Sequence, residues 1–263
     1  MSNFNEVWLS RGELDTERFA EALRLGLSEP AGQVAARRAT GSLRSYLQPR
    51  LADLPSPSLL PDMQVAAERL ADAVCAQERI TIFGDYDADG CTSSAVLSRF
   101  LGELGSQAKV RLPHRLKDGY GLAPSMVEDL APDCDLLITV DCGATAFPAL
   151  ELAQKLALPV IVCDHHTVAS SIPPAVAIIN PKRPDSDYPP GEPAAVGVAW
   201  NLAAWTRHVL RERGYFKDRP EPDLVALMGL VALGSVADMV PLTGANRIFV
   251  HHGLKSLENS PYP

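Results

Sequence analysis

Short apolar runs alternate with longer segments of helical periodicity through most of the chain. The apolar runs cover about 79–84, 135–140, 159–163 and 175–179, and each has the length of a strand; a further strand is predicted at 108–112. Helical periodicity lies between them, at about 92–104, 124–130 and 147–156. Strands that are apolar throughout and separated by helices are typical of a parallel sheet covered on both faces. We therefore predict an α/β fold, a doubly wound parallel sheet with helices on both faces, and leave the strand order open.

Helices are also predicted on either side of this alternating region. Near the N-terminus they cover about 15–25 and 34–47, and a proline-rich stretch follows at 54–61. This pattern predicts an N-terminal helical extension, 1–61, and a main domain, 62–263. Asp62 is expected to cap a helix that runs to Ala76. Beyond a proline-rich loop at 180–195, helices are predicted at about 196–212, 223–236 and 245–258.

Three carboxylates follow the first apolar run at alternate positions, Asp85, Asp87 and Asp89. Like charges this close repel one another, and burial makes the repulsion worse. A bound divalent cation is the usual compensation. The spacing also fits the start of an EF-hand loop, but the twelfth position of such a loop would be Val96 instead of glutamate, and a strand precedes it. We therefore interpret the segment as half of a different metal site.

Further candidate metal ligands directly follow three other apolar runs. Asp141 follows 135–140, the sequence Asp164-His165-His166 follows 159–163, and Asp238 follows 230–237. Ligands of open parallel sheets bind at the carboxyl ends of the strands. A mixed carboxylate and imidazole set suits Mn²⁺, Mg²⁺ or Co²⁺ better than a metal that prefers thiolates. A carboxylate such as Asp141 can bridge two cations, and a two-metal site with a shared water is the usual arrangement for phosphate ester hydrolysis.

Composition narrows the class of protein. With 46% hydrophobic and 21% charged residues the chain is typical of globular domains, and neither a membrane span nor a secretory signal is recognisable, so we expect a cytoplasmic protein without membrane contact. The five cysteines include no C-x-x-C pair, which argues against a disulfide framework and a thiolate zinc site. His251 and His252 are interpreted as surface residues.

Net charge is −8, which does not suggest a protein that coats DNA. The basic residues are nevertheless clustered, and both clusters are candidates for contact with a phosphate backbone. From the cluster at 109–117 we expect Arg115 and Lys117 to contact nucleic acid. The other cluster consists of four arginines between 37 and 50, for which ordinary solvated surface charge is an equally good interpretation.

The motifs GDYDADG, VDCG, DHH and GSVADMVPL together resemble those of the DHH phosphoesterase superfamily. Within it, the chain is similar to the branch of single-stranded-DNA-specific 5′→3′ exonucleases of DNA repair and recombination. LKDGYGL, AIINPKRPD and AAVGVAWNLA extend the likeness, which covers roughly 45–257. The resemblance implies a phosphodiester hydrolase that releases mononucleotides from single-stranded DNA with two Mn²⁺ or Mg²⁺ ions.

The resemblance also implies roles for individual residues. The implied metal ligands are Asp85, Asp87, Asp89, Asp141, His165 and Asp238. Asp141 is the implied bridge between the two cations. His166 is expected to contact the scissile phosphate or its water, and Asp164 to orient a histidine. These last three residues, Asp141, Asp164 and His166, are the predicted catalytic residues.

The chain departs from that branch because a second, substrate-holding domain is not recognisable. We therefore expect a protein that binds both metals but has weak or no exonuclease activity without that domain or a partner protein. A phosphodiesterase of short oligonucleotides or cyclic dinucleotides stays open as an alternative. A non-catalytic scaffold is disfavoured by the complete ligand set. An inorganic pyrophosphatase is disfavoured because its histidine would stand where this chain has Phe83.

Overall fold

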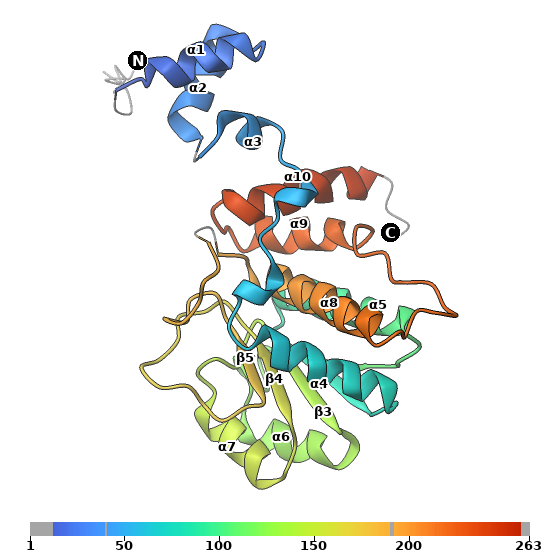
Figure 1. Cartoon of the computed structure of the whole chain (residues 1–263). Helices are drawn as coiled ribbons and strands as arrows, with labels where there is room; N and C mark the ends of the chain where they lie inside the picture. The colour runs from blue at the N-terminus through green and yellow to red at the C-terminus, as the bar shows by residue number, and fades with distance from the viewer. Residues whose placement is uncertain (1–12, 40, 190–191, 259–263) are drawn as a thin grey trace, which may run out of the picture. The chain divides into compact units, whose positions relative to one another are not determined.

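The structure, a computed structural model, describes residues 13–39, 41–189 and 192–258. The chain forms two compact units, Met1–Ala52 and Asp53–Pro263, and each is described by itself (Figure 1). The domain limit predicted at residue 61 stays a prediction.

A five-stranded parallel sheet forms the centre of the second unit. Its strand order is β2-β1-β3-β4-β5. The strands are β1 (Ile80–Gly84), β2 (Lys109–Arg111), β3 (Leu136–Val140), β4 (Val160–Cys163) and β5 (Ala177–Ile179). All four pairings are parallel, with Phe83 opposite Thr139 and Thr139 opposite Val162. The predicted α/β fold is therefore confirmed, and each strand lies within its predicted range.

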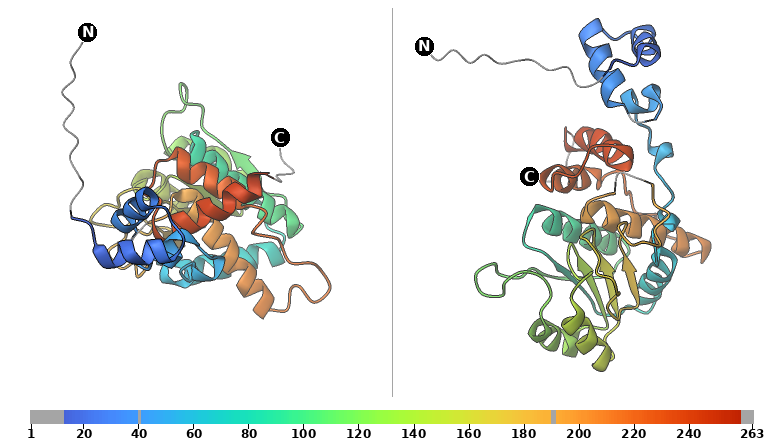
Figure 2. Two further views of the ribbon diagram at one scale, coloured as in Figure 1. Left: turned by 90° about the horizontal axis from the view of Figure 1, so that it is seen from above. Right: turned by 90° about the vertical axis from the view of Figure 1, so that its left-hand side faces the viewer.

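Helices cover both faces of the sheet (Figures 1 and 2). One face packs against α6 (Pro124–Leu130) and α7 (Phe147–Lys155). The other is covered by α4 (Met63–Cys75), α5 (Ala88–Glu103) and α8 (Ala195–Glu212). An outer layer consists of α9 (Met228–Ala237), which packs on α5 and α8, and α10 (Gly244–Glu258), which packs on α9. Short 3₁₀ turns are η1 (Leu51–Asp53), η2 (Pro57–Leu59) and η3 (Ala131–Asp133).

Burial of both faces explains the continuous apolar runs. Side chains of a strand alternate between the two faces, so every position of β1, β3, β4 and β5 meets a helix layer and is buried, whereas the residues of the edge strand β2 are exposed. Phe83, Leu137 and Val162 join the core under α6 and α7. Full burial of such a side chain contributes roughly 1.5–3 kcal/mol. The central strands are thereby fixed, and with them the residues that follow their carboxyl ends.

The first unit contains α1 (Thr16–Arg24), α2 (Glu29–Arg38) and α3 (Leu43–Leu47) around a small core. The single helix predicted over 34–47 is wrong, because the chain turns between α2 and α3. Gly41 adopts a φ of +72°, and Ser42 begins α3 by accepting a hydrogen bond from Ser45 N. The Arg18 guanidinium holds this corner through the carbonyl oxygens of Ala39 and Gly41.

Two helix starts differ from prediction. Helix α5 begins at Ala88, four residues earlier than expected, because Asp87 caps it: Gly90 N donates to Asp87 Oδ1 at 2.9 Å. Helix α9 begins at Met228 instead of 223, because the Asp223 carboxylate accepts hydrogen bonds from Val225 N and Ala226 N in a preceding turn.

Asp62 stands at the predicted N-cap of α4 but does not cap it. Its φ is +56°, and its carboxylate accepts a hydrogen bond from Ile178 N at 3.0 Å and pairs with Arg183. The side chain therefore ties α4 to the edge strand β5.

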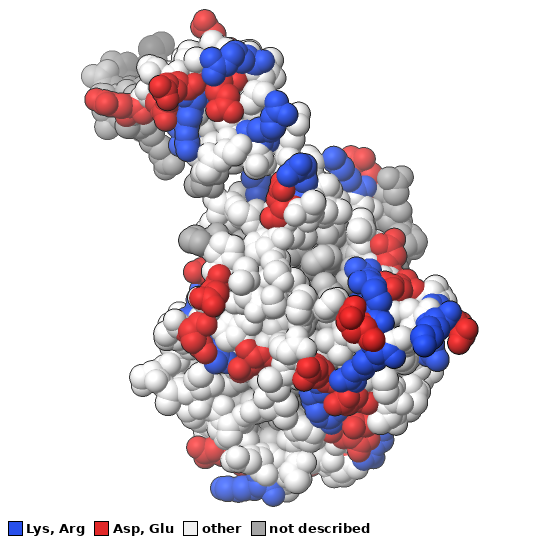
Figure 3. Space-filling view, in the orientation of Figure 1, with Lys and Arg blue, Asp and Glu red and all other residues white. Residues whose placement is uncertain are grey.

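None of the described helices is long and apolar enough to cross a membrane. On the face seen in Figure 3, side chains of both signs are intermixed where α4 and α8 reach the surface. Ion pairs here include Arg213 with Asp72 and Arg211 with Glu221. This part of the face therefore does not carry charge of a single sign.

Candidate metal centre

The predicted acids and histidines meet at the carboxyl edge of the sheet. Asp85, Asp141 and Asp164 directly follow β1, β3 and β4. Asp87 and Asp89 start α5, His165 and His166 follow Asp164, and Asp238 closes α9. Asp238 therefore follows a helix, whereas Asp85, Asp141 and Asp164 follow strands. The helix predicted at 223–236 is consistent with this position.

Three groups of these side chains can each hold a cation. The members of each group offer ligand atoms that lie within 4.8 Å of one another. The groups are Asp85–Asp87–Asp141, Asp89–His165–Asp238 and Asp141–His165–His166. Asp141 and His165 each belong to two groups, so Asp141 lies where a ligand shared between two cations would lie.

Asp141 is the most buried of these acids after Asp89. It is 1% exposed and adopts a φ of +60°, in the left-handed region. Burial, followed by the charges of Asp89 and Asp87, raises the pKa of Asp141 to about 10. Its Oδ1 lies 3.4 Å from His165 Nε2. Both atoms are buried, and neither has a hydrogen-bond partner among the described residues.

Such orphaned atoms call for an explanation, because buried polar atoms are normally paired. His165 Nε2 also lies 3.7 Å from the carboxylates of Asp89 and Asp238. Burial lowers the pKa of His165, so the imidazole is held in the neutral form that binds metals. Carboxylates around a neutral imidazole fit a hard divalent cation such as Mn²⁺ or Mg²⁺.

Asp89 is fixed by the start of α8. Its two carboxylate oxygens accept hydrogen bonds from Ala195 N at 2.7 Å and Val196 N at 2.9 Å. A carboxylate at a helix N-terminus is stabilised by the helix dipole. Burial nevertheless raises the pKa of Asp89 to about 6. The side chain is thereby held rigidly, with Oδ2 toward His165.

Asp164 fixes the orientation of His166. The Asp164 carboxylate accepts hydrogen bonds from the backbone N of Ala144, His165 and His166, and from His166 Nδ1 at 2.8 Å. Burial opposes the charged form, but these bonds outweigh it and lower the pKa of Asp164. The hydrogen bond to Asp164 raises the pKa of His166 to about 9. His166 is about half exposed, so its other nitrogen is accessible.

Two glycines keep the first acidic segment tight. A Cβ on Gly90 would lie 2.4 Å from Asp85 O and 2.6 Å from Asp85 N. A Cβ on Gly84 would lie 2.2 Å from Ser94 Oγ. A side chain at Gly90 would displace the backbone that carries Asp85, and a side chain at Gly84 would displace the Ser94 hydroxyl and the Gly90 carbonyl.

The predicted nucleic-acid residues lie on the loop between β2 and α6. Lys117 is exposed, and the Arg115 guanidinium carbon lies 5.5 Å from the centre of the Tyr86 ring. Tyr120 Oη lies 3.3 Å from His166 Nε2. Sequence reasoning missed Tyr86 and Tyr120. Gly119 and Gly121, both with positive φ, flank Tyr120 and were the available signal that this loop has a specific shape.

The cysteines and the second histidine pair take no part in the centre. Within the described ranges, no group of candidate ligands includes a cysteine. Cys142 and Cys163 are buried. His251 and His252 lie on α10.

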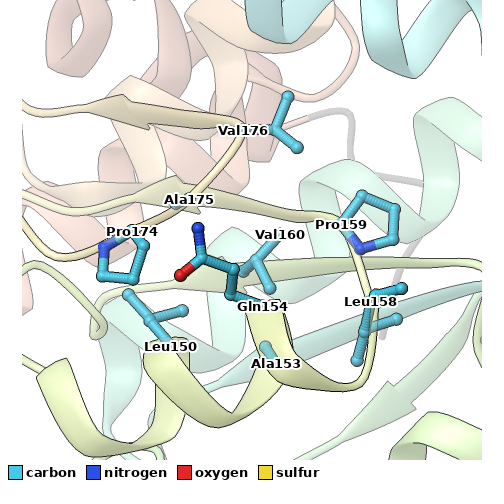
Figure 4. Close-up of a pocket in the computed structure, with 10 residues that line it drawn as sticks. Leu150, Ala153, Gln154, Leu158, Pro159, Val160, Pro174, Ala175 and Val176 are labelled. Atoms are coloured by element: carbon cyan, nitrogen blue, oxygen red, sulfur yellow. The ribbon is translucent and has the colours of Figure 1, made fainter.

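A separate cavity of about 540 Å³ lies at the opposite, amino edge of the sheet (Figure 4). It is bounded by the end of α7, the start of β4 and the segment before β5, and Gln154 extends over it (Figure 4). The remaining lining, where the structure describes it, is alanine, leucine, valine and proline. These side chains offer no ligands for a cation, so the chemistry belongs to the carboxyl edge.

Comparison with known proteins gives one family. The profile of the DHH family, N-terminal domain, matches residues 79–235. The single-stranded-DNA-specific exonuclease RecJ of Escherichia coli (strain K12) is 41% identical over 202 residues, which are 75% of this chain and 35% of that protein. RecJ of Bacillus subtilis (strain 168) is 38% identical over 220 residues, which are 83% of this chain and 26% of that protein. The chain thus spans about a third of the length of these curated relatives.

Solved structures of the same kind are similar in fold. A crystal structure of exonuclease RecJ bound to manganese has a TM-score of 0.69 at 37% identity, over 81% of this chain and 51% of that one. RecJ from Thermus thermophilus in complex with Mn²⁺ has a TM-score of 0.74 at 30% identity, over 94% of this chain and 34% of that one.

Proposed function

The chain belongs to the DHH family, and from this membership we propose that it hydrolyses phosphodiester bonds of single-stranded DNA with two divalent cations. The observation that carries the proposal is the buried pair of unpartnered ligand atoms, Asp141 Oδ1 and His165 Nε2, inside a complete set of acids. The RecJ proteins of Escherichia coli and Bacillus subtilis support single-stranded DNA as the substrate, since they are single-stranded-DNA-specific exonucleases. Cleavage from the 5′ end and a cytoplasmic location are parts of this proposal.

The proposed cations are Mn²⁺ or Mg²⁺, as in the related structures. One would be held by Asp85, Asp87 and Asp141, and the other by Asp89, His165 and Asp238 together with Asp141. Two such cations, when bound, lower the pKa of a water and offset the charge that develops on the phosphate. In this proposal Asp141 is shared between them.

The protein's own groups would orient the phosphate. His166 carries a proton at neutral pH because its pKa is about 9. Nε2 can therefore donate a hydrogen bond to a phosphate oxygen, while Asp164 holds Nδ1. Arg115 and Lys117, on the adjacent loop, would contact the flanking backbone as positive charges.

The test is hydrolysis of 5′-labelled single-stranded DNA with Mn²⁺, with products resolved by length and Asp141→Asn as the control. Mononucleotides released from the 5′ end, and lost in the variant, would support the whole proposal. Mn²⁺ binding without any product would mean that the chain needs a further domain or a partner protein. If the chain binds no Mn²⁺ and releases no product, the proposal is overturned.

The same assay separates the alternatives. A phosphodiesterase of short substrates would cleave a dinucleotide or a cyclic dinucleotide faster than a long strand. A scaffold would bind without cleaving, even when supplied with the missing part of a longer relative. The complete ligand set favours hydrolysis over the scaffold.

A further inference from the structure

Asn180 directly follows β5 at the carboxyl edge of the sheet and is fully buried. It lies beside the turn 164–166, because Cys163 is in register with Ile179 and Asp164 N donates a hydrogen bond to Ile179 O at 3.1 Å. The strand before it consists of alanine and isoleucine only. Burial of an amide next to such a strand costs free energy unless the amide is hydrogen-bonded, so the partners of Asn180 matter.

Both polar groups of the Asn180 side chain have partners, and these lie in separate segments. Nδ2 donates a hydrogen bond to His166 O at 2.9 Å, and Oδ1 accepts one from Lys182 N at 2.8 Å. A carbonyl oxygen can only accept and a backbone N–H can only donate, so the opposite orientation of the amide would break both bonds. The side chain therefore joins the turn that carries His166 to the loop after β5.

The loop after β5 is a fixed support for this side chain. Arg183 has a side chain that is 7% exposed, donates from Nη1 to Ile178 O at 2.7 Å and pairs with Asp62 and Asp185. Asp62 also accepts a hydrogen bond from Ile178 N at 3.0 Å. Asn180 therefore extends from backbone that is held to the start of α4.

The backbone after His166 has little regular structure to hold it. Asp164 accepts hydrogen bonds from His166 N and Nδ1, and neither bond fixes the peptide group that follows His166. Residues 167–176 are described throughout and form neither helix nor strand. The His166 side chain is 46% exposed, so packing surrounds only part of the ring. The hydrogen bond from Asn180 fixes His166 on its carbonyl side.

From these contacts we infer that Asn180 is a positioning residue for His166. The inference rests on the proposed function, in which His166 Nε2 donates a hydrogen bond to a phosphate oxygen. Asn180 acts on the backbone from which the imidazole extends, whereas Asp164 acts on the ring. Groups that orient a functional histidine in this way typically contribute roughly 10- to 100-fold to activity.

Two substitutions remove the hydrogen bond in different ways. Asn180→Asp keeps the acceptor for Lys182 N and loses the donor to His166 O, whereas Asn180→Leu removes both groups without adding charge. Asn201 provides matched controls, because it is buried and its Nδ2 donates to Gly197 O at the same 2.9 Å, within α8. Asn201→Asp and Asn201→Leu make the same chemical changes there. Near-UV circular dichroism verifies the fold, and Asn180→Ser replaces any Asn180 variant that does not fold.

The first readout does not need activity. In the metal-free chain, exchange of the His166 Nδ1 proton with water is followed by NMR at one fixed pH. Both Asn180 variants should speed this exchange at least about tenfold, because the ring leaves Asp164 more often. The Asn201 variants should leave it unchanged. If exchange is unchanged in both Asn180 variants, the inference is overturned and Asn180 serves only to join two loops.

Steady-state kinetics gives the second readout. Both Asn180 variants should lower kcat roughly 10- to 100-fold. The KM for single-stranded DNA and the affinity for Mn²⁺ should stay within about twofold, because the orientation of His166 matters in the transition state more than in binding. A raised KM with unchanged kcat would make Asn180 a binding residue and overturn the inference. Absence of hydrolysis in the unaltered chain would count against the proposed function, and the NMR readout would still decide the role of Asn180.

Discussion

Asp141 Oδ1 and His165 Nε2 lie 3.4 Å apart, both buried, and the described surroundings provide neither with a hydrogen bond. A carboxylate whose pKa is raised to about 10 faces an imidazole whose pKa is lowered. In both cases burial disfavours the charged form, and a cation would reverse the preference of the carboxylate. The pair is therefore strained without a metal and satisfied with one.

Substitution of Asp141 should separate chemistry from folding. Asp141→Asn should lose Mn²⁺ binding and lower hydrolysis by roughly a hundredfold or more, with stability close to that of the unaltered chain. Asparagine tolerates the φ of +60° at this position. Asp141→Ala should lose the same functions and about 1 kcal/mol more stability, because alanine does not favour this backbone region.

Calorimetric Mn²⁺ titration and urea unfolding measure the two effects. If the Asp141→Asn chain binds two equivalents of Mn²⁺ and cleaves normally, Asp141 is not a ligand shared by two cations. If the two variants are equally stable, the left-handed backbone at position 141 does not disfavour alanine.

Stability of the metal-free protein should fall as pH rises from about 7 to about 9. Folded Asp141 keeps its proton up to a pKa of about 10, whereas its ordinary value is 3.8. The folded state thus holds a proton that the unfolded state has released, and stability decreases by up to about 1.4 kcal/mol per pH unit. His166 acts in the same direction, since its contribution is complete below its ordinary value of 6.5 and is lost as pH rises through about 9.

Urea midpoints in EDTA at several pH values measure this slope. Asp141→Asn should make the slope of stability against pH smaller by the contribution of one proton, about 1.4 kcal/mol per pH unit. Saturating Mn²⁺ should reverse the trend, because metal binding displaces protons and strengthens with pH. A slope that is unchanged in the asparagine variant would mean that another group holds the proton.

Asp164→Asn should lower the pKa of His166 and remove the hydrogen bond that orients its ring. The carboxylate at 2.8 Å is the main cause of the raised His166 pKa, so the variant should return it from about 9 toward 6.5. Hydrolysis should fall by roughly 10- to 100-fold because the ring loses its orientation. An NMR titration of the metal-free chain reports the pKa, and Asp129→Asn on the exposed side of α6 is the control. A His166 pKa that stays near 9 would assign the shift to other charges.

Much of this arrangement could be predicted because it depends on local pattern. Strands buried on both faces produce apolar runs whatever their order, so the carboxyl ends of β1, β3 and β4 were located from sequence. Family membership, inferred from the four motifs, is confirmed by the profile match over 79–235.

What could not be predicted depends on contacts between distant segments. Asp89 is held by the start of α8, more than a hundred residues away, and Asp62 by β5 instead of its own helix. Strand order and the contact of Tyr120 with His166 also arise from tertiary folding. The break at Gly41 was missed because helical periodicity continues across it.

The basic loop should contribute to the salt dependence of DNA binding. Arg115→Ala with Lys117→Ala should weaken binding of single-stranded DNA and lower the slope of log affinity against log salt by about 1.4, since each phosphate contact contributes about 0.7. Lys155→Ala with Lys217→Ala removes the same charge elsewhere and should leave the slope unchanged. Anisotropy at several salt concentrations measures both. An unaltered slope in the loop variant would assign these residues to solvated surface.

Two glycines of α5 should respond oppositely to alanine. At Gly90 a Cβ would meet the backbone of Asp85 at 2.4 Å, so Gly90→Ala should cost on the order of 2–4 kcal/mol and weaken Mn²⁺ binding by displacing Asp85. At the exposed Gly102 no described atom lies within 4 Å of the added carbon, and Gly102→Ala should gain up to about 1 kcal/mol. Urea unfolding and Mn²⁺ titration of the two variants give the comparison. Equal stability would mean that the Asp85 backbone can move away at little cost, and the tight turn would then not be what positions the first metal ligands.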